Sequence, residues 1–428
     1  MKKSLITGLV VIVMAAISML IVNGCIPKKV DISKPANYVG SEKCKECHVE
    51  IYNGWRSTFH PYKFQDVSPE VVVGNFMKNN ILTVKGYITR MSRDVDDFFV
   101  TTIGPDNKEH TYKIKYVIGS FWKQRYVTEF PSGALHILPV QWNVKTQEWV
   151  DYHGLDKYKP GDGKYWSDKQ RTYQFKCTGC HNTNSQINYD EATDTFKTIW
   201  TEKGIGCEAC HGPGSNHIIA DIPDKSTTVI NPAKIPDPRR AAMVCGSCHT
   251  RGNSADGRFE YPAGYKPGGQ LNFLFDEKPG VYPDGSPKEH HQQYNDWELG
   301  EHAVAGVMCW HCHDPHAKGK ANKNQLKLPG SVLCKSCHTV VESKGVHGIH
   351  SINNCVGCHM PNTAKSAVKG DIRSHQFKVV SPELTIKEGG DMEKQPNSCN
   401  LCHYHKDDKP QEMWNILKKV KAEGKKRV

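Results

Sequence analysis

Residues 44–48 read Cys-Lys-Glu-Cys-His, and this Cys-x-x-Cys-His pattern returns seven more times along the 428-residue chain. The pattern contains 16 of the 17 cysteines, so only Cys25 lies outside it. The cysteine pairs are Cys44/Cys47, Cys177/Cys180, Cys207/Cys210, Cys245/Cys248, Cys309/Cys312, Cys334/Cys337, Cys355/Cys358 and Cys399/Cys402. The histidines that follow them are His48, His181, His211, His249, His313, His338, His359 and His403.

The spacing of the pattern matches one covalent cofactor. Two thiols three positions apart can each form a thioether to the same porphyrin, and the next histidine can reach the iron as its proximal ligand. A structural zinc site needs two such pairs per metal and does not need a histidine after every second cysteine. A redox-active Cys-x-x-Cys would occur once, near a βαβ pattern. The motifs therefore predict eight c-type haems, each with its iron.

The composition agrees with a core made partly of haem. Only 38% of the residues are hydrophobic, yet 9 Trp and 17 Tyr exclude a disordered chain. The formal net charge is +11, and each haem brings two propionates of the opposite sign. We therefore interpret the lysines as counter-charges for propionates and predict no nucleic-acid partner.

The start of the sequence predicts export. Two lysines precede an uncharged apolar run, Leu5–Val22, which leads into Asn-Gly-Cys25. This is typical of a signal peptide over 1–24 followed by lipidation of Cys25, which would hold the protein at a membrane. The alternatives are an uncleaved membrane anchor and simple cleavage. We expect an outer-membrane lipoprotein facing the periplasm or the cell surface, with an inner-membrane anchor in the periplasm as the alternative.

The motifs are unevenly spaced, and the long first gap reads as β structure. Apolar and polar residues alternate in Ile81–Thr89, Phe99–Ile103 and Tyr112–Ile118, with turn residues between them. We expect a mostly α and irregular multihaem cytochrome c fold with covalent haems as its core and a small antiparallel β module. The expected divisions are a signal peptide at 1–24, a first haem segment at 25–69, the β module at 70–152, a three-haem segment at 153–250, a Gly/Pro-rich linker at 251–290, a four-haem segment at 291–405, and a C-terminal helix with a basic tail at 406–428.

Several longer stretches resemble a known superfamily. These include Tyr38–His60, Gly206–His217, Tyr294–His302, Cys309–His316 and Cys355–Pro361, together with Ser-His-Gln-Phe from residue 374. Jointly they resemble the multihaem cytochromes c that include pentahaem nitrite reductases and octahaem hydroxylamine oxidoreductases. Nitrite reductases of the common type carry lysine in place of histidine in one motif, whereas all eight motifs here end in histidine. The resemblance thus implies a scaffold and iron ligands, and does not carry over an active site.

The 14 histidines outside the motifs are enough to give every iron a second, distal ligand. The resemblance implies that role for His60, His217, His302, His316 and His375. By position, His291 and one or both of His347 and His350 are further candidates. We expect no ligand role for His290, His311, His110, His136, His153 and His405. Ligation by methionine stays open as an alternative.

Two functions fit this sequence. The first is a relay that passes single electrons along eight mostly bis-histidine haems, with other cytochromes, a quinol-oxidising membrane complex, and a terminal reductase or extracellular acceptor as partners. The second is an oxidoreductase of small nitrogen or sulfur oxyanions, such as nitrite, hydroxylamine or tetrathionate, at one haem with an open sixth position. Whether every iron has a distal protein ligand distinguishes the two.

Overall fold

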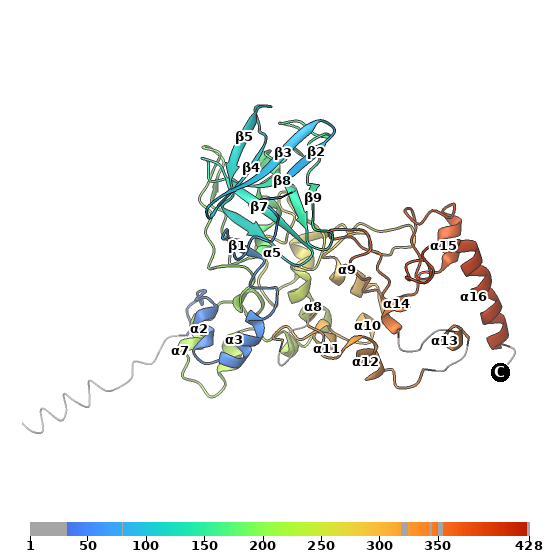
Figure 1. Ribbon diagram of the computed structural model, residues 1–428. Helices are drawn as coiled ribbons and strands as arrows, with labels where there is room; N and C mark the ends of the chain where they lie inside the picture. The colour runs from blue at the N-terminus through green and yellow to red at the C-terminus, as the bar shows by residue number, and fades with distance from the viewer. Residues whose placement is uncertain (1–31, 79, 318–323, 342–344, 350–353, 426–428) are drawn as a thin grey trace, which may run out of the picture.

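The computed structural model describes residues 32–78, 80–317, 324–341, 345–349 and 354–425. The predicted signal peptide, the predicted lipidation site Cys25 and the candidate ligand His350 lie outside these ranges. Within them, no helix combines the length and apolar character needed to cross a bilayer. A β region stands at the top of Figure 1, and short helices run below it from α2 and α3 at one side to α15 and α16 at the other.

The β region consists of two antiparallel sheets. One has the strand order β2-β3-β4-β5 and the other β1-β6-β7-β8-β9. Their bounds are β1 Phe64–Asp66, β2 Ile81–Val84, β3 Tyr87–Asp94, β4 Asp97–Ile103, β5 Glu109–Lys113, β6 Tyr116–Ile118, β7 Lys123–Glu129, β8 Leu135–Asn143 and β9 Glu148–Asp151. The predicted antiparallel structure is therefore present, and it begins with a strand before residue 70.

The sequence explains the form of these strands. The predicted strand over 81–89 is a hairpin, because Lys85 and Gly86 both have positive φ (44° and 90°) and connect the paired residues Val84 and Tyr87. Such two-residue loops match the twist of the strands that they join. Every residue of β8 is buried, and the aromatic side chains of Phe76, Trp142, Trp149 and Trp166 pack in one cluster with residues of both sheets. The β region therefore has a hydrophobic core of its own.

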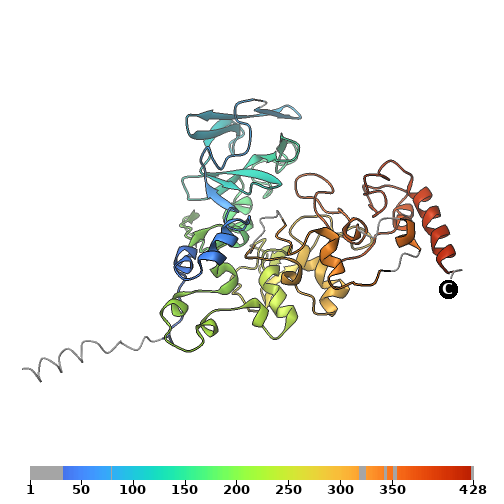
Figure 2. The same cartoon turned by 60° about the horizontal axis from the view of Figure 1, so that its bottom comes forward.

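The remainder of the chain consists of short helices, small two-stranded sheets and loops (Figure 2). The helices are α2 Ser41–Lys45, α3 Val49–Arg56, α4 Tyr173–Lys176, α5 Thr178–His181, α6 Glu208–His211, α7 Ser215–Ile219, α8 Pro238–Gly246, α9 Gln293–Glu298, α10 Glu301–Val304, α11 Cys309–Cys312, α12 Gly330–Lys335, α13 Val346–Ile349, α14 Cys355–His359, α15 Pro382–Lys387 and α16 Pro410–Lys425. The small sheets pair β10 Asn182–Thr183 with β13 Glu202–Lys203, β11 Tyr189–Asp190 with β12 Thr195–Phe196, and β14 Gly252–Ser254 with β15 Phe275–Glu277.

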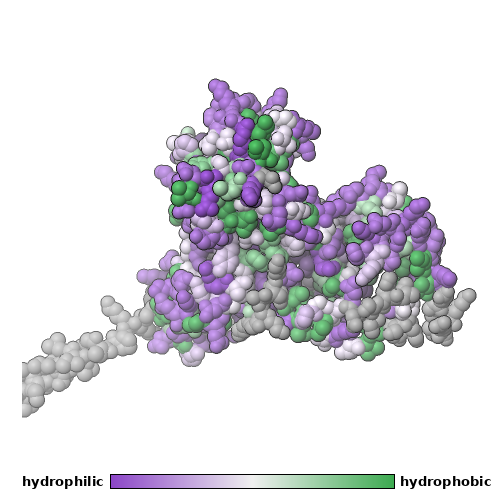
Figure 3. Space-filling view, in the orientation of Figure 1, coloured by the Kyte–Doolittle hydropathy of each residue, from purple (hydrophilic) through white to green (hydrophobic). Residues whose placement is uncertain are grey.

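The segment 251–290, which the sequence predicts to be a linker, packs against its neighbours. It contains the β14–β15 hairpin, and Leu271 and Phe275 are buried in a cluster with Trp297 of α9. Gly300 has extended backbone angles and separates α9 from α10. The outer surface in Figure 3 is mainly hydrophilic, with hydrophobic patches over the β region.

A buried carboxylate holds the first motif segment to the third. Glu208, within the third motif, is 2% exposed and accepts backbone N–H bonds from Val39, Gly40 and Gly214 at 2.7–3.0 Å. Hydrogen bonds to a charged group each contribute about 1.5–3 kcal/mol. The side chain therefore fixes segments that are far apart in the sequence.

We predict that Glu208→Gln lowers the free energy of unfolding of the haem-loaded protein by about 2–4 kcal/mol, because the amide NH₂ would face backbone donors. Chemical denaturation measures the change. The matched control is Glu46→Gln, whose carboxylate is exposed and pairs with the exposed Lys43 at 2.9 Å. The control should change stability by less than about 0.5 kcal/mol. Equal effects of the two variants would contradict this role of Glu208.

Candidate haem sites

Most motifs form a helical turn that brings their two cysteine side chains and their histidine side chain to the same side. In motifs such as those of His48, His211 and His313, the backbone N–H of the histidine donates to the backbone carbonyl of the first cysteine at 2.9–3.1 Å. Positions i, i+3 and i+4 of a helical turn share a face. Both sulfurs and the imidazole can therefore reach one porphyrin.

The motifs surround one continuous cavity of about 4140 Å³. All 16 motif cysteines line it, and so does every motif histidine except His403. The cysteines are free of disulfides. Drug-sized ligand pockets are about 300–1,000 Å³, so the cavity has room for several large groups. The donor set and the space fit covalent haem.

Imidazole rings face one another across this cavity. Two rings that bind one metal ion from opposite sides have centroids about 6.2–6.6 Å apart, since the metal–nitrogen bond is about 2.0–2.1 Å and the centroid lies about 1.1–1.2 Å beyond the nitrogen. The centroid separations are 6.1 Å for His48–His217, 6.5 Å for His249–His60, 6.0 Å for His211–His316, 6.3 Å for His313–His375, 6.0 Å for His338–His302 and 6.3 Å for His359–His347. Each pair joins a motif histidine to one predicted distal candidate.

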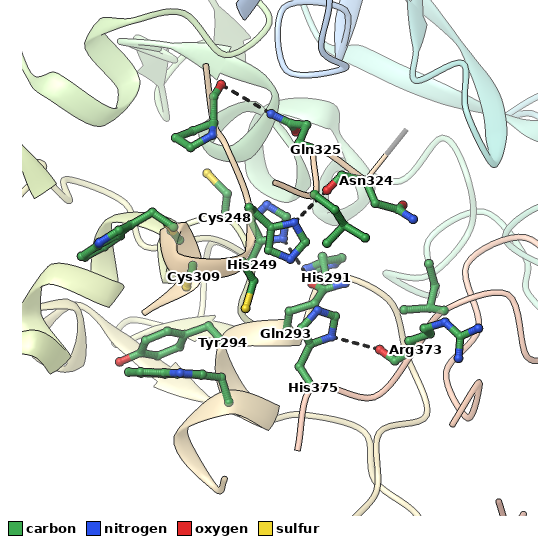
Figure 4. A pocket seen from close by; sticks show the side chains of 18 of the residues that line it. Cys248, His249, His291, Gln293, Tyr294, Cys309, Asn324, Gln325, Arg373 and His375 are labelled. Carbon is green, nitrogen blue, oxygen red and sulfur yellow. Dashed lines mark hydrogen bonds between the residues drawn. The ribbon is translucent and has the colours of Figure 1, made fainter. Parts of the chain in front are cut away.

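Hydrogen bonds fix which nitrogen of these rings is free. The Nδ1–H groups of His211, His313 and His375 donate to backbone carbonyls of Ile230, Asn324 and Arg373 at 2.7–3.1 Å. A carbonyl can only accept, so the proton lies on Nδ1 and the lone pair of Nε2 is left for a metal. Figure 4 shows the bond from His375 and a contact between His249 Nδ1 and Gln293 Oε1, which are 3.2 Å apart.

Burial keeps these imidazoles neutral. It lowers the pKa of His60 to about 3 and that of His375 to about 4, with smaller effects of neighbouring charges. A protonated imidazole cannot bind a metal, so the neutral ring is the form that an iron site requires.

His181 differs from the other buried motif histidines. Its Nδ1–H donates to the carbonyl of Lys63 at 3.1 Å, and among the described residues it is not one of the six ring pairs above, its interaction with another imidazole being electrostatic, with His291. Burial, with smaller contributions from the charges of Lys63, Arg125 and Lys123, lowers its pKa to about 4, although the hydrogen bond to the Lys63 carbonyl raises it. The second motif therefore lies in a strongly basic environment.

The basic side chains near His181 come from the β region and from residue 251. Burial lowers the pKa of Lys123 to about 6, and its ammonium donates to the carbonyl of Ser366 at 2.6 Å. Arg125 donates to Gln141 Oε1 at 2.9 Å and to the hydroxyl of Tyr152 at 2.8 Å. The sequence contained no motif for these residues, because they lie in strands that read as ordinary amphipathic β structure.

The predicted distal candidate His291 contacts an arginine, unlike the six candidates that face a motif histidine. Its Nδ1–H donates to the carbonyl of Thr250, and its Nε2 accepts from Arg251 at 3.0 Å. His290 lies against it, with ring centroids 4.5 Å apart. Figure 4 shows His291 near His249 and His375, and both His249 and His181 lower its pKa electrostatically. His291 thus belongs to the surroundings of the second motif.

The remaining histidines lie in other settings. His403 is exposed, and its ring contact among the described residues is with Tyr404, at 5.5 Å. His110 pairs with Asp106, His405 with Asp408, and His136 is buried in β8. His311 Nδ1 accepts the N–H of Met308 at 2.9 Å. His153 contacts Arg171, with 2.9 Å between Nε2 and Nη2.

Neighbouring motifs lie close together. Cysteines of different motifs lie close enough to shift each other's pKa in the pairs Cys44–Cys207, Cys180–Cys248, Cys245–Cys309 and Cys334–Cys355. Electrostatic effects also connect Cys312 with Cys337 and Cys358 with Cys402. The first motif and the third to eighth motifs therefore form a connected series. The second motif lies beside the fourth, through Cys180 and Cys248.

Comparison with known proteins agrees with this geometry. Residues 302–342 match the family described as a doubled CXXCH motif, and residues 144–212 match that of cytochrome c554 and c-prime. The sites define a c-type haem protein, and the chain belongs to the multihaem c-type cytochromes.

The chain is similar to two curated multihaem proteins. It is 24% identical to the cytochrome c nitrite reductase subunit NrfA of Nitratidesulfovibrio vulgaris over 54% of this chain and 55% of that protein. It is 23% identical to the dissimilatory sulfite reductase MccA of Wolinella succinogenes over 76% of this chain and 51% of that protein. The chain thus spans about half the length of these relatives.

A solved structure has the same fold. The outer cell wall cytochrome OcwA superposes with a TM-score of 0.65, at 23% identity, over 89% of this chain and 86% of that chain. The arrangement described here is therefore a multihaem cytochrome fold.

We predict that His375→Gly opens the sixth position of the iron held by His313. Carbon monoxide binding to the reduced protein should then rise by one equivalent, and added imidazole should reverse the gain by refilling the space. Optical titration measures both effects. The control His110→Gly, at an exposed histidine that pairs with Asp106, should leave the stoichiometry unchanged. An unchanged stoichiometry in His375→Gly would contradict this pairing.

Proposed function

We propose that this protein is an octahaem electron carrier that passes single electrons between redox partners. The set of facing imidazole pairs is the observation that carries the proposal. A haem iron with two imidazole ligands has a closed sixth position, which suits electron transfer and excludes substrate.

We assign the distal ligands from these pairs. His217, His60, His316, His375, His302 and His347 would complete the irons of His48, His249, His211, His313, His338 and His359. His350 stays a predicted distal ligand. Because His291 engages Arg251 through the nitrogen that would bind iron, we propose it as a pocket residue beside the second motif.

The contacts between motifs support a continuous path. The order first, third, fourth, fifth, sixth, seventh and eighth motif follows the cysteine pairs and the electrostatic neighbours. Haems attached to neighbouring cysteines lie close together, and the protein sets each potential through ligand, burial and nearby charge. Electrons would enter and leave near the two ends of this series.

We further propose that the protein is exported and held at a membrane through lipid on Cys25. The apolar run before Cys25 supports this, and the similar structure is described as an outer cell wall cytochrome. Its partners would be other cytochromes, a quinol-oxidising membrane complex, and a terminal reductase or extracellular acceptor.

A second function is favoured by the site of His181. Within the described ranges no imidazole is paired with this motif histidine as in the six pairs above, and the basic side chains Lys123, Arg125 and Arg251 lie around it. Fixed positive charges in a buried site stabilise anions and the charge that develops on them. Two relatives are named as nitrite and sulfite reductases. We propose that this haem can bind and reduce a small nitrogen or sulfur oxyanion while the other haems deliver electrons.

We predict that the reduced wild-type protein binds carbon monoxide at no more than two of eight haems, and that the oxidised protein gives a high-spin EPR signal from the haem of His181. Closed bis-imidazole sites are low-spin and do not take up the gas. Binding at three or more haems would overturn the relay. Entirely low-spin spectra with no gas binding would overturn the second function and leave the relay.

We predict that below pH 6, where Lys123 is protonated, Lys123→Met weakens azide binding to the oxidised high-spin haem about 10-fold, since one buried cation near the anion is lost, and that the effect shrinks as the pH rises above 6. Optical titration measures the affinity. Carbon monoxide, which is neutral, should bind the reduced variant within about twofold of wild type, which is the internal control. Unchanged azide affinity would remove Lys123 from the anion site.

A further inference from the structure

A second, smaller cavity of about 500 Å³ adjoins the haem cavity beside the second motif. We call it the access pocket; it is lined by Asp151, His153, Gly154, Lys157, Tyr158, Lys164 and Arg171. His153 and Arg171 also line the haem cavity. These two side chains therefore form the partition between the two spaces.

The inner side of the partition belongs to the second motif. Tyr152, next to His153, packs with Cys177 against one hydrophobic cluster. Arg125 lies over the Tyr152 ring, 3.7 Å from its centroid. A small molecule that passed the partition would arrive beside the thioether edge of the haem of His181.

The mouth of the access pocket is positive. Lys157 and Lys164 are exposed, and neither forms an ion pair with another described residue. Asp151 is the acidic group of the lining; the backbone N–H groups of Gly154 and Leu155 bind its carboxyl, whose Oδ1 is buried without a partner among the described residues. The lining thus holds three basic side chains, Lys157, Lys164 and Arg171, against one half-buried carboxylate whose pKa is raised by burial, and its net charge favours an approaching anion.

The partition has unusual backbone and side-chain geometry. His153 has φ of 77°, a conformation that residues other than glycine rarely adopt, and its ring lies 3.6 Å from the centroid of Tyr152. It contacts Arg171, whose Nε is buried without a hydrogen-bond partner among the described residues. The Arg171 guanidinium therefore has an unused donor at the boundary.

We propose that the access pocket is the route by which small anions reach the haem of His181, and that the His153–Arg171 partition must move aside to admit them. This inference rests on the second function proposed above. Lys157 and Lys164 attract the anion at the surface, and Arg171 binds it as it passes the partition. A neutral ligand uses the same route without the benefit of the charges.

The first test changes the charge at the mouth. Lys157→Gln combined with Lys164→Gln should slow azide association with the oxidised protein about 3- to 10-fold at low ionic strength and reduce its salt dependence, because steering is electrostatic. Carbon monoxide association with the reduced protein should stay within twofold. The matched control, Lys78→Gln combined with Lys108→Gln, removes the same charge from exposed positions of the β region outside the pocket and should leave the azide rate unchanged. Stopped-flow absorbance measures all these rates.

The second test changes the partition. His153→Gly suits the positive φ and removes the ring, so the variant should fold and admit both azide and carbon monoxide at least threefold faster. If both ligands bind wild type and neither set of variants changes their rates, the access route is elsewhere and only this inference fails. If neither ligand binds wild type at all, the second function fails and this inference fails with it.

Discussion

The facing of a motif imidazole by a second imidazole across the haem cavity is the constraint on which the rest of this structure depends. A motif histidine comes with its cysteines on one helical turn, but its facing partner comes from a distant segment, as His60 does for His249 and His316 does for His211. Such pairs connect parts of the chain that are otherwise joined by short helices and loops. Ligation can thereby supply cohesion that aliphatic side chains supply in other proteins, which fits the low hydrophobic content.

The β region is held together by its own hydrophobic core, and it positions side chains at the edge of the haem cavity. Its aromatic core is independent of the motifs, so it can hold side chains rigidly at the edge of the haem cavity. In β7, Gln124 is buried between Lys123 and Arg125, and these two cations line the haem cavity. A register shift between Arg125 and Val127 re-aims the strand there. The sheet thus places basic side chains beside His181, which has no paired imidazole among the described residues.

Electron carriers and reductases can share such a scaffold because the difference between them is local. Closing or opening one sixth position changes an electron-transfer haem into a ligand-binding one without altering the series of neighbouring haems. This chain is similar both to proteins named as reductases and to one named as a cytochrome, as expected for a shared scaffold. In this chain, the surroundings of His181 are the place where an electron carrier and a reductase would differ.

The sequence by itself determined the cofactor class, since the Cys-x-x-Cys-His spacing encodes thioether attachment and a proximal ligand within one turn. It also predicted the antiparallel β region, because alternation of apolar residues along a strand is a local property. Which histidine faces which motif was decided by tertiary structure, as were the hairpin packed within 251–290 and the break at Gly300. The basic surroundings of His181 could not be read from the chain, because Lys123, Arg125 and Arg251 acquire their meaning only where strands and loops from distant segments meet.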